Sequence, residues 1–163
     1  MRAISIKHPG SVDVLEQIEV PVPKPKQGEL LIKVHTAAVN RTDIMKRESV
    51  SLKPPYPILG VEVAGEVVEN KSDISTFTPV TKVYGLGNQG GYAENAVMPA
   101  DRAILLPDTL DYVSAAGISE VFLTAYQTLY WLGKLQEGET VLIHAGASGV
   151  GTAAIQLARQ LSH

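Results

Sequence analysis

Residues 141–151 read Val-Leu-Ile-His-Ala-Gly-Ala-Ser-Gly-Val-Gly, and they lead directly into a run of small and apolar residues. The apolar stretch Thr140–His144 predicts a short parallel strand buried on both faces. The three- and four-residue spacing of apolar residues after it predicts a helix from Val150 to Leu161. A strand, a glycine-rich turn and a helix in this order are typical of a phosphate-binding unit, because the backbone N–H groups and the dipole at the start of a helix favour an anion.

The turn itself has the pattern G-x-S-x-x-G, from Gly146 through Ser148 to Gly151. We expect Gly146 to allow the tight turn, the middle position to let a pyrophosphate approach, and Gly151 to let the helix and strand pack closely. Ser148 adds a hydroxyl that can bond a phosphate oxygen. The alternative is a structural turn whose residues are small only for packing. The residue that reads the ribose lies about 20 residues further along in such units, beyond residue 163.

The chain before residue 110 has a different character from the chain after it. Glycine, proline and short alternating runs dominate there, so the sequence predicts a β-rich region of the barrel or sandwich type. The Pro-rich residues 21–28 predict an extended connector, and Asn40 is expected to cap a short helix that ends near Glu48. The predicted strands are residues 2–7, 14–20, 29–39, 61–69, 91–98 and 102–106.

The pattern becomes helical after Pro107. Apolar spacings predict helices over Asp111–Ile118 and Glu120–Leu132, with Gly133 ending the second. The expected fold class is therefore mixed α and β (α+β), with a β-rich domain at 1–110 and a second segment at 111–163.

A second candidate site lies in the β-rich region, where polar residues stand beside turns and strand ends. In a regular strand Glu62 faces the same way as Glu66, and the simplest expectation is a solvated side chain. His35 and His144 are expected to be core histidines rather than catalytic bases. The site candidates in this region are Asn40, Thr42, Asp43, Tyr56 and Glu62.

Composition excludes several classes of function. The chain has no cysteine, so disulfides, a cysteine nucleophile, cysteine-ligated zinc and iron–sulfur clusters are excluded. The formal charge of −3, without a long basic run, argues against binding to nucleic acid or an anionic membrane. No apolar stretch approaches the roughly 20 residues of a membrane helix. We expect a cytoplasmic protein, and the four scattered histidines suggest no metal site.

Several blocks together resemble a known family. Residues 58–68 read ILGVEVAGEVV, residues 90–100 read GGYAENAVMPA, and residues 139–159 read ETVLIHAGASGVGTAAIQLAR. With the NRTD turn at 40–43 and AAGISEVFLTAYQTL at 115–129, this series is similar to the zinc-independent quinone oxidoreductase branch, zeta-crystallin-like, of the medium-chain dehydrogenase/reductase superfamily. The resemblance covers essentially the whole chain but only the N-terminal half of the family's length.

The resemblance implies a GroES-like, β-barrel-type catalytic domain at 1–110. It also implies connecting helices and the first strand, turn and helix of a Rossmann domain at 111–163. The implied activity is NADPH-dependent reduction of quinones or α,β-unsaturated carbonyls by hydride transfer without zinc, and no catalytic acid is assigned. The zinc ligands of related alcohol dehydrogenases fall at Asn40 and Val61, which cannot replace a thiolate and an imidazole.

The resemblance also implies which residues bind the cofactor. Asn40 and Thr124 approach the nicotinamide, and four residues of the turn lie along the pyrophosphate: Ser148, Gly149, Val150 and Gly151. The chain departs from the family pattern at three places. The family's usual Gly-Asp is replaced by Val80-Thr81, and its I-P-E motif is replaced by Ile118-Ser119-Glu120. Residues 50–52 stand where the family commonly has a tyrosine, and Tyr56 is a candidate to take the place of that tyrosine.

Two other functions compete with the reductase. The chain can instead be a truncated, non-catalytic GroES-like module, because a dinucleotide lies across a crevice between two βαβ halves. A chaperonin-like assembly module rests on the strand pattern alone and ranks last. We expect the 163-residue chain by itself to be inactive. Either the unpaired edge of the predicted strand Thr140–His144 pairs with another copy, or the closing segment frays while the β-rich region stays folded.

Overall fold

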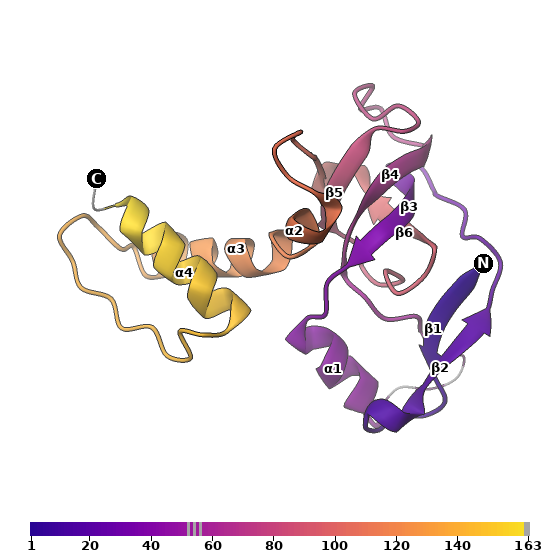
Figure 1. The fold of residues 1–163 in the computed structure, drawn as a ribbon, viewed down its shortest axis with the longest axis horizontal. Helices are drawn as coiled ribbons and strands as arrows, with labels where there is room; N and C mark the ends of the chain where they lie inside the picture. Colours follow the sequence, from indigo (N-terminus) through magenta and orange to yellow (C-terminus); the bar gives the residue numbers. More distant parts are fainter. Residues whose placement is uncertain (52, 54, 56, 162–163) are drawn as a thin grey trace. The chain divides into compact units, whose positions relative to one another are not determined.

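The computed structural model describes residues 1–51, 53, 55 and 57–161. The chain divides into two compact units, Met1–Gly117 and Ile118–His163, and each is described by itself (Figure 1). No helix among the described residues is long and apolar enough to cross a membrane.

The first unit is built on two antiparallel sheets. Strands β1 (Arg2–Ile6) and β2 (Leu15–Glu19) form a two-stranded ribbon, and the other five strands form a sheet of order β6-β3-β4-β5-β7. Those five are β3 (Glu29–Ala37), β4 (Glu62–Asn70), β5 (Lys82–Leu86), β6 (Asn95–Pro99) and β7 (Ala103–Leu105). The mixed fold class is confirmed, but the sheet is open because β6 and β7 form its two edges rather than pairing.

Alternation of apolar residues explains most of this sheet. Apolar residues of β3, β4 and β5 form one buried cluster with residues of β6 and the connecting segments: Leu30, Ile32, Val63, Val67, Phe77, Val83, Met98 and Ala100. At Gly65 the two central strands approach closely, since a Cβ there would lie 2.9 Å from the Ile32 Cγ2 atom. A second buried cluster contains Ala64, the neighbour of Val63 on β4, with Leu106, Ala115 and Ala116, so both faces of the sheet contribute to the core.

In the first unit, the structure departs from the predicted strands at β5 and at residues 91–98. Strand β5 was not predicted, because Lys-Val-Tyr-Gly-Leu offers only a weak alternating pattern with a glycine inside it. The run at 91–98 begins pairing as a strand only at Asn95, since Ala93 makes a single isolated bridge to Ala3.

The turn before β5 contains a strained residue. Val80 has φ of +66° and is 76% exposed, and it stands where the resembled family has glycine. A β-branched residue in the left-handed region costs roughly 1–2 kcal/mol. Val80→Gly should therefore raise the free energy of unfolding by about 0.5–1 kcal/mol after glycine's entropic cost. Urea denaturation measures this change.

Val22→Gly is the matched control for Val80→Gly. Val22 is 47% exposed and is not among the residues with positive φ, so glycine there relieves no strain and should slightly destabilise the protein. An equal change in the free energy of unfolding for both variants would contradict backbone strain at Val80.

The short helices of the first unit begin after capping residues, of which Asn40 was predicted as a cap and Asp111 was placed inside the helix. Helix α1 (Arg41–Glu48) follows Asn40, and helix α2 (Tyr112–Ala116) follows Asp111, whose carboxylate accepts a 2.7 Å hydrogen bond from the Ser114 N–H. Single turns of 3-10 helix occur at η1 (Val12–Val14) and η2 (Ala100–Arg102). Helix α1 is confirmed as predicted, and α2 is shorter than the predicted 111–118.

The second unit contains three helical segments. They are α3 (Ser119–Tyr126), the π-helical η3 (Gln127–Leu132) and α4 (Gly149–Gln160). Helices α3 and α4 pack through Ala125, Ala153 and Ala154. The predicted helix 120–132 is thus present, but it changes from an α-helix to a π-helix after Tyr126. In this segment the Thr128 hydroxyl donates to the carbonyl oxygens of Thr124 and Ala125. It ends at Gly133, as expected.

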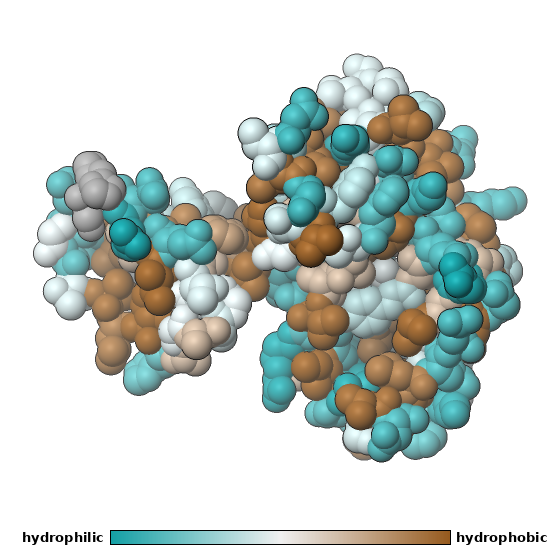
Figure 2. Space-filling model, viewed as in Figure 1, coloured by the Kyte–Doolittle hydropathy of each residue, from teal (hydrophilic) through white to brown (hydrophobic). Residues whose placement is uncertain are grey.

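The predicted strand Thr140–His144 is wrong. These residues have no strand conformation, and Val141 and Leu142 are 38% and 80% exposed. A strand exists only when a neighbour supplies the other half of its hydrogen bonds, and the described part of the second unit contains no strand to pair with it. Figure 2 shows hydrophobic surface on this unit.

Candidate functional site

The glycine-rich turn places hydrogen-bond donors at the start of α4. Ser148 is the N-cap, and its Oγ accepts a 3.0 Å hydrogen bond from the Gly151 N–H. The N–H groups of the first helical residues, Gly149 and Val150, have no intrahelical acceptor. The Ser148 hydroxyl can still donate while its oxygen caps the helix. Three donors therefore meet at the positively polarised end of a helix.

Close backbone packing holds the turn against α4. A Cβ at Gly151 would collide with the Ala145 carbonyl oxygen and lie 2.7 Å from the Gly146 Cα. Gly151 therefore packs closely against the turn, whereas the strand expected to pack there is not formed. Gly146 does not have the expected role in the tight turn. A Cβ there would meet its nearest atom, the Ile155 Cδ1, at an ordinary 3.6 Å, and the residue with left-handed φ, +52°, is Ala145.

A buried polar network surrounds Asn40 in the first unit. The Asn40 side chain donates from Nδ2 to the Glu62 Oε2 over 2.9 Å. Its backbone N–H donates to the Asp43 Oδ2, and its carbonyl oxygen accepts from the Asp43 N–H, each over 3.1 Å. Glu62 is 1% exposed and Asn40 8%. The expectation that Glu62 is solvated is wrong, because pairing with Asn40 lets the carboxylate be buried.

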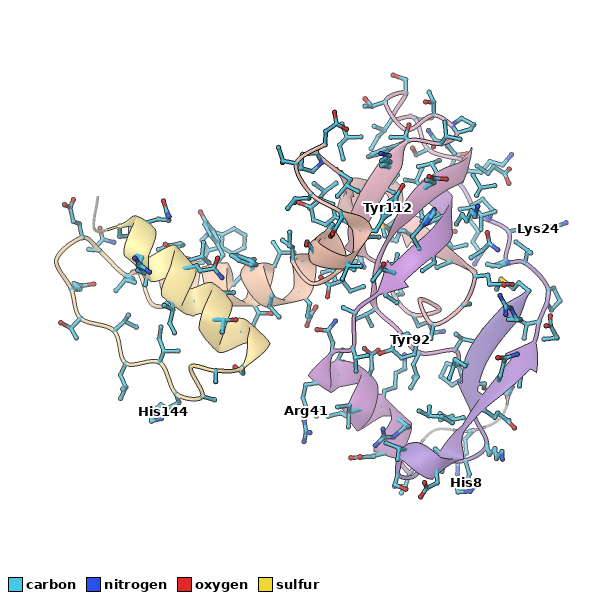
Figure 3. All side chains as sticks on the ribbon, viewed as in Figure 1. His8, Lys24, Arg41, Tyr92, Tyr112 and His144 are labelled. Atoms are coloured by element: carbon cyan, nitrogen blue, oxygen red, sulfur yellow. The ribbon has the colours of Figure 1, made fainter. Side chains whose placement is uncertain are left out.

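Asp43 ties this network to two loops. Its Oδ1 accepts from the Gly60 N–H over 3.0 Å, and its Oδ2 also accepts from the Tyr92 hydroxyl over 2.9 Å. Burial raises the pKa of Tyr92, and the hydrogen bond to Asp43 and the charge of Asp43 raise it further. Tyr92 therefore stays protonated and donates permanently to Asp43. Figure 3 labels Tyr92 in the first unit.

The structure places the predicted cofactor residues in two groups. Asn40 belongs to the first unit, and Thr124, Ser148, Gly149, Val150 and Gly151 belong to the second. Thr124 is half-buried in α3. Of the other candidates, Thr42 is exposed on α1, and Val61 is half-buried just before β4. Tyr56 and Leu52 lie outside the described residues.

Neither histidine singled out in the sequence is a core residue, so that expectation is wrong. His144 is exposed in the second unit. The His35 ring stacks on Tyr112 with ring centroids 4.3 Å apart, and its Nε2 lies 3.6 Å from the Glu66 Oε1. The Tyr112 hydroxyl donates to the same oxygen over 3.0 Å. Its contacts with Tyr112 and Glu66 therefore hold His35 at a partly exposed position. Figure 3 labels Tyr112 and His144.

The Tyr112 hydroxyl lowers the pKa of Glu66 below its usual value, with a smaller contribution from His35. Because this pKa is lower in the folded chain, the stabilisation is present above the unfolded-state pKa and is lost as pH falls through the folded-state pKa. Tyr112→Phe keeps the ring and should raise the pKa of Glu66. Its cost in stability should be greatest at neutral pH and shrink in acid.

Carboxyl-carbon NMR titration of Glu66 measures this pKa directly. Tyr130→Phe is the control, because the Tyr130 hydroxyl binds the Leu157 carbonyl oxygen over 2.7 Å and touches no ionisable group. A pKa for Glu66 that is identical in Tyr112→Phe and the unaltered chain would show that the hydroxyl does not stabilise the carboxylate.

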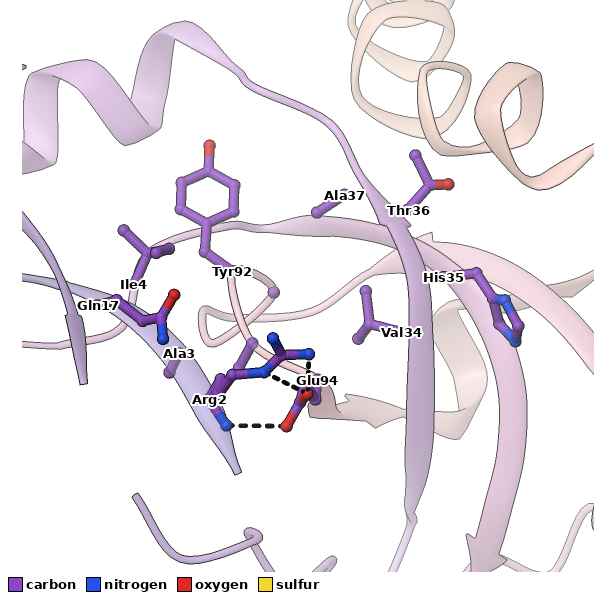
Figure 4. Close-up of a pocket in the computed structure, with 12 residues that line it drawn as sticks. Arg2, Ala3, Ile4, Gln17, Val34, His35, Thr36, Ala37, Tyr92 and Glu94 are labelled. Carbon is purple, nitrogen blue, oxygen red and sulfur yellow. Dashed lines mark hydrogen bonds and ion pairs between the residues drawn. The ribbon is translucent and has the colours of Figure 1, made fainter. Parts of the chain in front are cut away.

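The first unit also has a pocket of about 320 Å³ between β1, β3 and the loop before β6. Figure 4 shows Arg2 paired with Glu94 in this pocket, with the Tyr92 ring directed away from the pair. The Arg2 N–H and Nε each lie 2.8 Å from a Glu94 oxygen. Asn40 does not line the pocket. No group of three or more possible metal-ligating residues (His, Cys, Asp or Glu) occurs within the described ranges.

Comparison with known proteins relates this geometry to a family. Residues 26–108 match the alcohol dehydrogenase GroES-like domain. Quinone oxidoreductase of Sus scrofa is 37% identical over 98% of this chain, which covers 50% of that relative. The quinone oxidoreductase structure from Coxiella burnetii is 34% identical, with a TM-score of 0.91 over 99% of this chain and 54% of that one.

A mycobacterial protein whose structure was solved with NADPH is 32% identical, with a TM-score of 0.92 over 99% of this chain and 50% of that one. The chain thus spans about half the length of the curated relatives it matches. It belongs to the alcohol dehydrogenase GroES-like family and, with it, to the quinone oxidoreductase branch of the medium-chain dehydrogenase/reductase superfamily.

Proposed function

We propose that these residues form the substrate-side domain and the pyrophosphate turn of an NADPH-dependent, zinc-independent reductase of quinones or α,β-unsaturated carbonyls. The proposed boundaries are 1–110 for the catalytic domain and 111–163 for the connecting helices and the start of the nucleotide-binding domain. The proposed location is the cytoplasm. Bound NADPH would supply a hydride to an electron-poor carbon of the acceptor.

The observation that carries the proposal is the start of α4. The N–H groups of Gly149 and Val150 and the hydroxyl of Ser148 are the donors that a pyrophosphate needs. Gly151 keeps these donors in place by its close contact with Gly146. In this proposal Asn40 and Thr124 contact the nicotinamide. The use of NADPH is supported by the mycobacterial relative solved with it.

Zinc independence is supported by residue chemistry at two positions. The Asn40 side-chain nitrogen donates a hydrogen bond to Glu62, and the Val61 side chain has no atom that can bind a metal. An amide and an isopropyl group do not make a zinc site.

The experiment joins residues 1–163 to the second half of the Sus scrofa quinone oxidoreductase. We expect this joined chain to oxidise NADPH in the presence of a quinone, and the 163-residue chain alone to remain at background. A folded joined chain that binds no NADPH would favour the other candidate, a non-catalytic GroES-like module. The observation in favour of that candidate is that Thr140–His144 do not form a strand.

We also propose that the 163-residue chain associates with itself through Thr140–His144. Leu142 is 80% exposed, and an apolar segment with unpaired backbone groups is an association site. Leu142→Lys should shift the protein toward monomer in sedimentation velocity measured at several concentrations. Val12→Lys, at a residue 63% exposed in the first unit, is the control and should leave association unchanged. A concentration-independent monomer in the unaltered chain would contradict the proposal.

A further inference from the structure

The pocket between β1, β3 and the loop before β6 has no role in the proposed reaction. Its volume is about 320 Å³, and Asn40 does not line it. Pockets that take small organic ligands begin at about 300 Å³, so this one can hold a molecule built on a single ring. Its lining combines an ion pair, an amide side chain and apolar side chains.

The ion pair fixes the Arg2 guanidinium at the pocket. Glu94 Oε1 lies 2.8 Å from the Arg2 Nε and 2.7 Å from its Nη2, and Glu94 Oε2 accepts from the Arg2 backbone N–H over 2.8 Å. A guanidinium has five N–H donors, and no described residue accepts a hydrogen bond from the Arg2 Nη1. Nη1 is therefore a donor that remains for a ligand, and the pair with Glu94 reduces the freedom that Arg2 loses on binding one.

The other walls of the pocket supply apolar surface and one amide. Ile4 and Gln17 are directly opposite each other in the β1–β2 ribbon, and both line the pocket together with Val34 and Ala37 of β3. In the view of Figure 4 the guanidinium lies between Gln17 and Val34. Within the described ranges the Gln17 amide has no hydrogen-bond partner, so it can donate to or accept from a ligand.

The charges at the pocket favour an uncharged ligand. The hydrogen bond from the Arg2 backbone N–H, and then the bond from its guanidinium, lower the pKa of Glu94 below its usual value, so the pair is ionised at neutral pH. A ligand carboxylate would be attracted by Arg2 but repelled by Glu94. An uncharged carbonyl oxygen can accept from Nη1 without carrying a charge for Glu94 to repel.

We infer that this pocket binds an uncharged organic molecule that has a carbonyl group on an apolar body. Arg2 donates from Nη1 to the carbonyl oxygen, and Gln17 binds a neighbouring polar atom of the ligand. Ile4 and Val34 contact the apolar body. The site is separate from the proposed pyrophosphate turn, so it does not depend on the proposed function.

The test is an NMR titration of the 163-residue chain with benzamide, which has a carbonyl group on one apolar ring. The backbone amide signals of Val34 and Ala37 should shift and saturate. Arg2→Met keeps an unbranched apolar side chain without the donors and should weaken binding about tenfold or more, as expected for one hydrogen bond to a charged group. Arg102→Met is the matched control, because Arg102 is exposed and does not line the pocket, and it should leave the affinity unchanged.

The ligand class is tested with toluene and benzoate. Toluene has the ring without the carbonyl group and should bind at least about tenfold more weakly than benzamide. Benzoate should bind more weakly than benzamide to the unaltered chain, and Glu94→Gln should strengthen benzoate binding more than benzamide binding. These comparisons decide the inference even if Arg2→Met does not fold. Signals that do not saturate with benzamide, equal affinities in Arg2→Met and the unaltered chain, or toluene or benzoate binding as tightly as benzamide would overturn it.

Discussion

Replacing Asp43 by alanine should remove a large share of the stability of the first unit. Asp43 is 3% exposed, and its carboxylate accepts from the N–H groups of Asn40 and Gly60 and from the Tyr92 hydroxyl. Without it, three donors lose their acceptor in a largely buried place. At about 1–3 kcal/mol for each unsatisfied group, the loss is on the order of 3–9 kcal/mol. The total stability of a domain is roughly 5–15 kcal/mol.

Thermal and urea denaturation measure the effect of Asp43→Ala. We expect the melting temperature to fall by more than about 10 °C. Asp108→Ala removes the same carboxylate from an exposed position and should change little. Tyr92→Phe removes one of the three donors and should cost about 1 kcal/mol. If Asp43→Ala and Asp108→Ala melted at the same temperature, the network would not hold the loops together.

Gly151→Ala should separate the start of α4 from the glycine-rich turn. The added Cβ would meet backbone atoms, Gly146 Cα at 2.7 Å and Gly146 C at 2.8 Å, and backbone atoms cannot move aside as a side chain can. The Ser148 cap on the Gly151 N–H would be lost with the packing. Overpacking of this kind costs about 1–3 kcal/mol. The small alanine-rich core between α3 and α4 has little with which to offset that loss.

Amide hydrogen exchange along α4 reports this change directly. Protection in α4 should fall sharply in Gly151→Ala, while the strands of the first unit keep theirs. Gly146→Ala is the matched control in the same turn, because its Cβ finds ordinary contact with Ile155 at 3.6 Å. Similar protection in both variants would show that Gly151 is not required for the close approach.

Local patterns predicted the elements whose signals lie within a few residues. The Asn40 cap, the end of the helical region at Gly133 and the apolar face that packs α4 all depend on neighbours along the chain. Strand β5 was not predicted, because one of its five residues is Gly85, whose missing side chain interrupts the alternation of apolar and polar residues. The conformation of Thr140–His144 was mispredicted for the opposite reason. Its composition favours a strand, but strand formation requires a partner that the described second unit does not contain.

The polar site was harder to predict than the fold, because its order depends on contacts between distant residues. Glu62 is buried by a hydrogen bond from Asn40, 22 residues away, and Asp43 is bound by Tyr92, 49 residues away. Alternation along β4 cannot distinguish a buried, paired carboxylate from a solvated one. One signal in the sequence pointed in the right direction. The polar residues Asn40, Asp43 and Glu62 all stand at element ends, where side chains from separate segments meet.

The most direct test of the proposed pyrophosphate site is NADPH binding to the joined chain, measured by calorimetry. We predict that the joined chain binds NADPH and that Ser148→Ala weakens binding about tenfold or more, as expected for one hydrogen bond to a charged oxygen. Gly151→Val should abolish binding, because its larger side chain cannot fit against Gly146. Unchanged affinity in the Gly151→Val protein would contradict the assignment of this turn to the pyrophosphate.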